Sequence, residues 1–264
     1  MKKSTPIKSI KTLVAVRVIA NGGKFLGDDI SGAVITIHNE DTGELLASGT
    51  TAGGSGDIWE IMIQPRPRTQ SIPVNGASLF LAGLKANNNM PMHLRISATG
   101  PGAGLQSKAT TTTTQWIVPG LKDPKGKAIV WNCLLELPGL LVQVMQPATH
   151  QNVSTLPLSI NFMANVAMMC GCPIDNNTDT DGMHSFPNPW PVADFIVGCY
   201  ILNNGVTVDQ VALQFNTAAN IPGQYTGSWT MKQPGFYTGC VYAYQLSTGN
   251  TGTANVSFFN QPSA

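Results

Sequence analysis

Residues 31–57 read SGAVITIHNEDTGELLASGTTAGGSGD, and this stretch carries the pattern of two short strands. GAVITIH, at Gly32–His38, alternates with a period of two, which is the period of a half-buried β-strand. The polar turn NEDTGE follows, and LLASG then leads into a glycine-rich bend. The stretch therefore predicts a strand, a turn and a second strand.

The same alternation recurs along the whole chain, and no long segment has the period of about 3.6 residues that marks a helix. Before Leu137 we expect further strands at Thr12–Ile19, Asp57–Ile63, Ala77–Ala82, Met92–Ala98, Gln115–Val118 and Ala128–Leu137. After GLLVQVMQP we expect Leu156–Met168, Val192–Leu202, Val206–Phe215, Tyr225–Met231, Gly235–Gln245 and Thr251–Phe259. Short strands at this spacing predict an all-β protein built from stacked sheets.

Length and charge suggest that these strands form two domains. The chain has 264 residues, enough for two domains that each bury a core of their own. The Pro-Gly pair in LPGL, Leu137–Leu140, lies between two apolar strands and predicts a short, stiff linker. Basic residues become rare after Lys127, with only Lys232 beyond it, whereas carboxylates continue. We therefore expect tandem domains at residues 1–136 and 137–264, with attraction between copies.

Two stretches resemble known sandwich families. Residues 31–57 resemble the transthyretin-like or carboxypeptidase-regulatory-like β-sandwich, through the T-G turn and the G-T-T before the glycine-rich bend. PGFYTGCVYAYQLSTGNTG, residues 234–252, is similar to a hairpin of bacterial immunoglobulin-like surface modules, which begins with P-G-x-Y and closes with D-x-x-G-N-x-G. Gln245 stands where an acidic residue is common there. The resemblance implies a transthyretin-like sandwich followed by an immunoglobulin-like one, with Tyr237 as a buried corner tyrosine whose hydroxyl caps the backbone upstream.

The cysteines suggest a disulfide in the second half. The candidates are Cys170, Cys172, Cys199 and Cys240. If Tyr237 faces inward, alternation turns Cys240 outward, so the inter-sheet disulfide of antibody domains does not carry over. A bond between Cys199 and Cys240 on the outer face, or a bond from either member of the C-x-C pair to one of them, stays open. Residues in a C-x-C pair seldom bond to each other. Cys133 is expected to be a buried, unpaired thiol.

MMCGCP, residues 168–173, also offers soft metal ligands. Thiolates and thioethers prefer Cu(I), and His184 lies near in sequence, so a copper site would use Cys170, Cys172 and His184. Redox chemistry would instead favour a C-x-x-C pair at a helix N-terminus, and the sequence has neither.

DNNTDTDG, at Asp175–Gly182, resembles the first half of a calcium loop. Asn177, Asp179 and Asp181 would take the first three ligand places, and Gly182 the turn. Asn188 stands where the loop's bidentate glutamate would be expected, so the alternative is a solvated Asp/Asn-rich loop. We rank calcium above copper, and no motif requires a cofactor.

Composition and motifs argue against several classes of function. Charged residues make up 11% of the chain, against about 25% in an average domain, and the net charge is +1. No basic stripe interleaved with aromatics points to nucleic acid, and no apolar run approaches the ~18 residues of a membrane span. G-x-S-x-G, H-E-x-x-H and P-loop motifs are absent, and the four histidines are scattered. We therefore expect a protein that is not an enzyme.

The expected location is extracellular or the cell envelope, although residues 1–23 lack the apolar core of a signal peptide. A longer precursor, unconventional export, an intracellular protein or a virion protein would each fit that start. The leading hypothesis is a non-enzymatic structural protein that self-associates, as a filament, sheath or surface-layer subunit, or that adheres to other surface proteins. The segment before Thr12 is expected to dock on a neighbouring copy. The alternatives are a periplasmic or surface metal-binding protein and a virion structural subunit.

Overall fold

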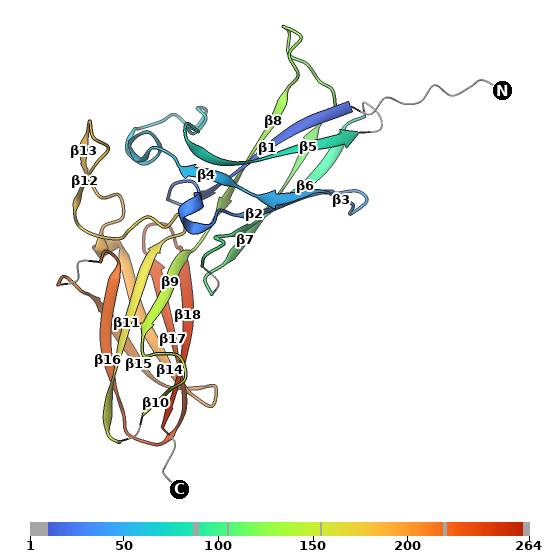
Figure 1. Ribbon diagram of the computed structural model, residues 1–264. Helices are drawn as coiled ribbons and strands as arrows, with labels where there is room; N and C mark the ends of the chain where they lie inside the picture. The colour runs from blue at the N-terminus through green and yellow to red at the C-terminus, as the bar shows by residue number, and fades with distance from the viewer. Residues whose placement is uncertain (1–9, 87–89, 105, 154, 219–220, 261–264) are drawn as a thin grey trace.

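The computed structural model describes residues 10–86, 90–104, 106–153, 155–218 and 221–260, and strands dominate them (Figure 1). The strands up to the junction are β1 (Ile10–Ala20), β2 (Val34–Asn39), β3 (Leu45–Thr50), β4 (Ala52–Ser55), β5 (Ala77–Ala86), β6 (Met92–Gly100), β7 (Ala109–Ile117) and β8 (Val130–Leu137). Those beyond it are β9 (Leu140–Gln146), β10 (Gln151–Asn152), β11 (Leu158–Met168), β12 (Thr178–Thr180), β13 (Ser185–Pro187), β14 (Phe195–Asn203), β15 (Val206–Phe215), β16 (Gln224–Met231), β17 (Gly235–Gln245) and β18 (Thr251–Asn260). Three short helical turns are η1 (Asp28–Ile30), η2 (Trp59–Ile63) and η3 (Val192–Asp194).

The all-β class with sandwich-like sheets is confirmed, with 58% of residues in strands and 5% in helix. Within the described ranges, no helix has the length and apolar character needed to cross a membrane. The segment before Thr12, expected to dock on a neighbouring copy, lies mostly outside the described residues.

The first half forms two four-stranded sheets, ordered β4-β5-β1-β8 and β3-β2-β6-β7. Period-two alternation explains their core, because every second side chain of a strand faces the opposite sheet. Val16 of β1, Ile35 and Ile37 of β2 and Ile96 of β6 are all fully buried. Each such side chain contributes about 1.5–3 kcal/mol by leaving water. Within its sheet β1 is central, antiparallel to β5 and parallel to β8.

The stretch 31–57 forms β2, a turn and β3, as predicted, but the strand predicted at Asp57–Ile63 is wrong. Residues Trp59–Ile63 form the helical turn η2 instead. The Asp57 carboxylate accepts a hydrogen bond from the Glu60 N–H (2.8 Å), and its carbonyl accepts one from the Ile61 N–H (3.0 Å). An aspartate that caps the first N–H groups of a turn favours helical over extended backbone. The apolar alternation was thus outweighed by this cap.

In the second half, eight strands pair in the order β10-β18-β17-β14-β15-β16-β11-β9. The sheet folds back on itself, and Figure 1 shows its two layers enclosing a core below the first half. Phe162 and Phe258 are buried there with their rings 5.9 Å apart, edge to face. Tyr237 is 5% exposed, and its hydroxyl donates to the Gln233 carbonyl (3.2 Å). The corner tyrosine predicted from the sequence is confirmed.

The two halves meet in a contact that we call the seam. The buried apolar side chains of both halves form one continuous cluster. At the seam, the Trp190 indole N–H donates to the Gly22 carbonyl (2.8 Å). The Asn250 side-chain amide donates to the Asn21 carbonyl (2.9 Å) and accepts from the Gly139 N–H (3.0 Å). Sheet membership changes between Leu137 and Leu140, while the domain limits 1–136 and 137–264 stay a prediction.

Candidate functional site

The C-x-C cysteines, Cys170 and Cys172, form a disulfide with each other, the pairing that the sequence pattern disfavoured. Gly171 between them has φ +78°, a left-handed conformation that glycine adopts without steric cost. This bend brings the two Cα atoms to 5.4 Å, within the normal range for a disulfide. Both cysteines are buried. As a disulfide, the two sulfurs lack the thiolate charge that a Cu(I) ligand supplies.

Cys199 and Cys240 are unpaired, and the outer-face bond between them is wrong. Cys199 pairs in register with Val241, which faces the core, whereas Cys240 pairs with Tyr200 on the outer face. The two thiols therefore lie on opposite faces of one sheet. Burial raises the pKa of the Cys199 thiol to about 12, which keeps it protonated at neutral pH.

Cys133 is a buried, unpaired thiol, as the sequence predicted. Burial raises its pKa to about 11. A protonated thiol is a poor nucleophile, so this position suits packing and not chemistry.

The Asp175–Gly182 segment does not fold into one ligand shell. Asp181 lies at the tip of the β12–β13 hairpin, where its carboxylate accepts the backbone N–H groups of Met183 (2.8 Å) and His184 (2.6 Å). Asp175 accepts the Asn177 N–H (2.9 Å). Burial, and next the charge of Asp175, raise the pKa of Asp179. Among the described residues no three His, Cys, Asp or Glu side chains converge as a metal site, and calcium binding stays a prediction.

His184 is held at the hairpin and does not join the cysteines. Its Nδ1 lies 2.7 Å from the Asp181 carboxylate. Its ring stacks on the Trp59 indole with the centroids 4.1 Å apart and the planes 1° from parallel. Phe186 of β13 packs against the same indole. Because Trp59 belongs to η2, the β12–β13 hairpin is tied to the first half.

Replacing His184 with alanine is expected to raise the pKa of Asp181. Hydrogen bonds from His184 hold that pKa at about 2, below the ordinary value of 3.8. A carboxylate whose pKa is lower in the folded than in the unfolded protein stabilises the folded state at a pH above the unfolded pKa. This stabilisation is lost as the pH falls through the pKa of the folded protein. Titration of Asp181 by NMR should therefore show a higher midpoint in His184→Ala. An unchanged midpoint would mean that the imidazole has no influence on the carboxylate.

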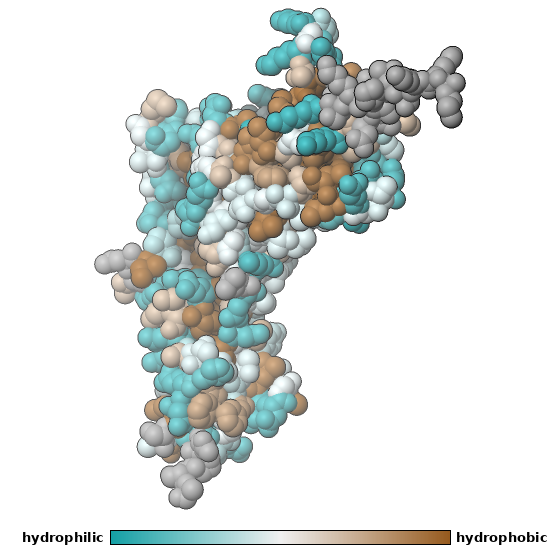
Figure 2. Space-filling view, turned by 45° about the vertical axis from the view of Figure 1, so that its right-hand side comes forward, coloured by the Kyte–Doolittle hydropathy of each residue, from teal (hydrophilic) through white to brown (hydrophobic). Residues whose placement is uncertain are grey.

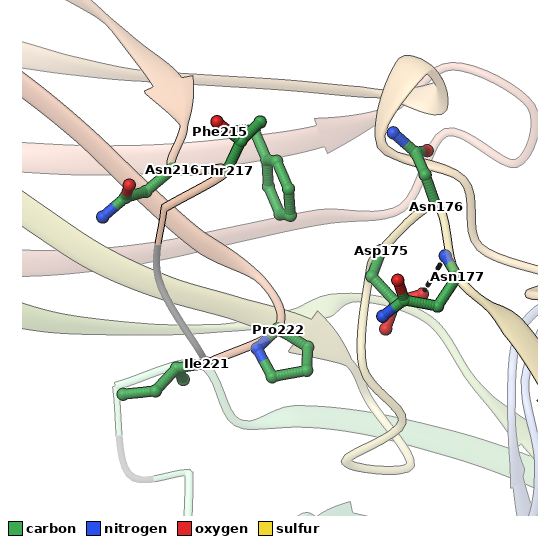
Figure 3. A pocket seen from close by; sticks show the side chains of 8 residues that line it. All are labelled: Asp175, Asn176, Asn177, Phe215, Asn216, Thr217, Ile221 and Pro222. Carbon is green, nitrogen blue, oxygen red and sulfur yellow. Dashed lines mark hydrogen bonds between the residues drawn. The ribbon is translucent and has the colours of Figure 1, made fainter.

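A polar cavity of about 430 Å³ opens beside the start of this segment (Figure 3). It is lined by Asp175, Asn176, Asn177, Phe215, Asn216, Thr217, Ile221 and Pro222. Polar side chains that line the cavity form hydrogen bonds to the surrounding loops. Asn176 accepts the Val192 N–H (3.0 Å), and Asn216 donates to the Gln224 side chain (2.8 Å). Because these side-chain amides already make hydrogen bonds within the protein, a structural role is favoured for them.

The outer side of the β4-β5-β1-β8 sheet, which we call the β1 face, carries exposed leucines together with polar and charged residues. The latter are Lys11, Arg17, Lys85, Asn132 and Glu136. Its side chains follow from the register, in which Leu81 of β5 lies beside Ala15 of β1, and Val130 of β8 lies beside Leu13. Leu81 is 52% exposed and Leu134 of β8 is 46% exposed. Figure 2 shows hydrophobic side chains gathered over the first half, at the top of the view. Contiguous apolar surface of this kind marks interaction sites.

The outer side of β14 and β17 carries three tyrosines, and we call it the tyrosine face. It consists of Ile196, Gly198, Tyr200, Cys240, Tyr242 and Tyr244. The outward neighbours in register are Thr251, Thr253 and Asn255 on β18 and Gln210 and Ala212 on β15. No side chain among these positions is charged. An exposed aromatic strip of this kind is a second candidate interaction surface.

Neither surface was predicted from the sequence, although the alternation in β17 could have predicted the tyrosine face. Alternation that turns Tyr237 inward also turns Cys240, Tyr242 and Tyr244 outward together. The β1 face is harder to predict from the sequence, because its composition depends on which strands become neighbours in the sheet. The contact between Trp59 and His184 joins distant segments and leaves no local pattern.

No model of a known protein family matches the sequence, and a comparison with curated proteins also gives no match. Among solved structures, an engineered protein aligns over 48% of this chain at 14% identity and a TM-score of 0.31; the chain covers 21% of it. The fibronectin(III)-like modules of Clostridium thermocellum CbhA align over 96% of this chain and 95% of their own, at 12% identity and a TM-score of 0.28.

The N-terminal four Ig domains of Dscam1 isoform 4.44 align over 97% of this chain and 53% of their own, at 12% identity and a TM-score of 0.19. The last two are β-sandwich proteins, fibronectin(III)-like and immunoglobulin-like. At these TM-scores the likenesses place the chain in no family.

Proposed function

We propose that this protein is a non-enzymatic structural protein of the cell surface or of secreted material, and that it self-associates through the β1 face. The observation that carries the proposal is the exposure of Leu81 and Leu134 on one sheet face, where Leu81 lies beside Ala15 and Leu134 lies beside Arg17. Each apolar Å² removed from water on association contributes roughly 25 cal/mol. A second copy offers the same apolar surface, as a two-fold interface requires.

The charges on the β1 face favour one orientation of two copies. Lys11 and Lys85 lie directly opposite each other at one end, where like charges on neighbouring strands repel. Glu136 lies at the other end, beside Ile19, and Arg17 lies beside Leu134 near that end. Two copies packed face to face in opposite directions keep their lysine ends apart.

The test is the oligomeric state of the full chain, measured by sedimentation velocity from micromolar to near-millimolar concentration. The wild type is expected to shift from monomer to dimer or larger species. Leu81→Asp should weaken this association by about 100-fold or more, because a carboxylate would be buried without a partner. Val206→Asp is the matched control, since Val206 is 67% exposed on a strand of the other half.

Two results would contradict the proposal. One is a wild-type chain that stays monomeric over the whole concentration range. The other is an oligomer that Leu81→Asp and Val206→Asp affect equally. Circular dichroism of both variants confirms that the sheets remain folded.

A further inference from the structure

We propose that the tyrosine face binds a neutral polysaccharide, with the rings of Tyr200, Tyr242 and Tyr244 as the platform on which sugar rings stack. This site lies on the second half and is separate from the β1 face. The inference does not depend on self-association, because the two proposals rest on different residues and different measurements.

The platform is held in place before any ligand arrives. Gly198 lies beside Tyr242 in the register, and a Cβ at Gly198 would lie 2.5 Å from the Tyr242 hydroxyl oxygen. The missing side chain thus lets the Tyr242 ring cross over β14. Its hydroxyl accepts a hydrogen bond from the Gln210 amide of β15 (2.8 Å). The Tyr200 ring stacks against Tyr242 with the centroids 5.2 Å apart. Fixed rings lose little conformational entropy on binding.

The tyrosine side chains are exposed enough to contact a ligand. Tyr200 is 42% exposed, Tyr244 is 39% exposed, and Ile196 beside Tyr244 is 49% exposed. Tyr242 and Tyr244 are two residues apart on one strand, a separation of roughly 6.6 Å along the sheet. Three tyrosines on two neighbouring strands form an elongated aromatic strip, which suits a polymer chain more than a single small molecule.

The chemistry of the face selects a neutral ligand rich in hydroxyls. The C–H groups on the flat side of a sugar ring carry slight positive charge and pack on the negative face of an aromatic ring. Thr251, Thr253 and Asn255 line one side of the strip and offer hydrogen-bonding groups to sugar hydroxyls. Acidic polymers need Lys or Arg, and Lys232 is the one such residue after Lys127 in the sequence.

The experiment is co-sedimentation of the full chain with microcrystalline cellulose and, in a parallel arm, with insoluble chitin. We expect binding to at least one of them, unchanged in molar sodium chloride because no ion pair is involved. Tyr200→Ala and Tyr244→Ala should each weaken binding by about tenfold or more. Tyr200→Phe keeps the ring and should bind like the wild type.

Trp116→Ala is the matched control, because Trp116 is a 57% exposed aromatic residue on the other half and should not affect binding. Thermal unfolding of each variant confirms its fold. Failure to sediment with either polysaccharide would overturn the proposal, as would equal losses in Tyr200→Ala and Trp116→Ala. If Tyr200→Ala instead converts an oligomer to a monomer without changing sedimentation with polysaccharide, the face is an interface between copies and the proposal is wrong.

Discussion

Trp190→Ala is expected to lower the free energy of unfolding by about 3–5 kcal/mol, the range measured for large aromatic side chains removed from protein cores. Trp190 is 1% exposed and belongs to the apolar cluster at the seam. The substitution leaves a cavity in this cluster, which its close-packed neighbours can fill only in part. It also leaves the Gly22 carbonyl without its indole partner.

Chemical denaturation followed by circular dichroism measures this loss. Trp190→Phe separates its causes, since it retains most of the apolar volume and removes the hydrogen bond, and its loss should be clearly smaller. Trp116→Ala removes the same side chain at a 57% exposed site, where the ring stacks on His93 with the centroids 4.5 Å apart, and should cost only about 0.5–1.5 kcal/mol. A loss below about 1 kcal/mol in Trp190→Ala would mean that the seam contributes little to stability.

Asn250→Ala is expected to cost about 2–4 kcal/mol. Asn250 is 2% exposed, and its side chain bonds to Gly139, Asn21 and the Gln245 side chain (3.0 Å). Alanine cannot replace any of these bonds. A buried polar group left without a partner costs about 1–3 kcal/mol, and Gly139 is itself buried. The loss of stability therefore comes from several buried polar groups that are left without hydrogen-bond partners.

Thermal and chemical denaturation of Asn250→Ala test this expectation. Asn152→Ala is the control, because Asn152 is exposed on the short edge strand β10 and should change stability by no more than about 0.5 kcal/mol. Similar stabilities for the two variants would show that the Asn250 bonds are replaced by water. That outcome would also weaken the view that the two halves are held together by a specific polar contact.

The strands were predictable because one physical rule, burial of every second side chain, acts on each strand locally. The rule placed β2, β11 and β17 within a few residues of their limits, and it also oriented Tyr237 and Cys240 correctly. It failed at Asp57–Ile63, where apolar residues alternate but the Asp57 side chain caps a helical turn. An alternating pattern indicates which side chains are buried, but it does not predict a hydrogen bond made by a single side chain.

The candidate sites were less predictable, because they depend on contacts between distant segments. The pairing of Cys170 with Cys172 follows from the left-handed backbone at Gly171, which composition does not reveal. Cys199 faces the core together with Val197 and Ile201 of β14, and its register partner Val241 is buried beside it. The Tyr200 and Tyr242 stack needs the same register together with the missing side chain of Gly198. Within a hairpin the turn fixes the register, whereas strands of separate hairpins have no turn between them and only their hydrophobic patterns restrict it.

The central place of β1 has a consequence for synthesis of the protein. One side of β1 pairs with β8, from Leu13 with Val130 to Ala20 with Leu137. β1 therefore keeps one edge unpaired until the chain has been made as far as Leu137. A nascent strand with an open edge can join another chain by mistake, so slow elongation across the first half should favour misassembly and the binding of chaperones.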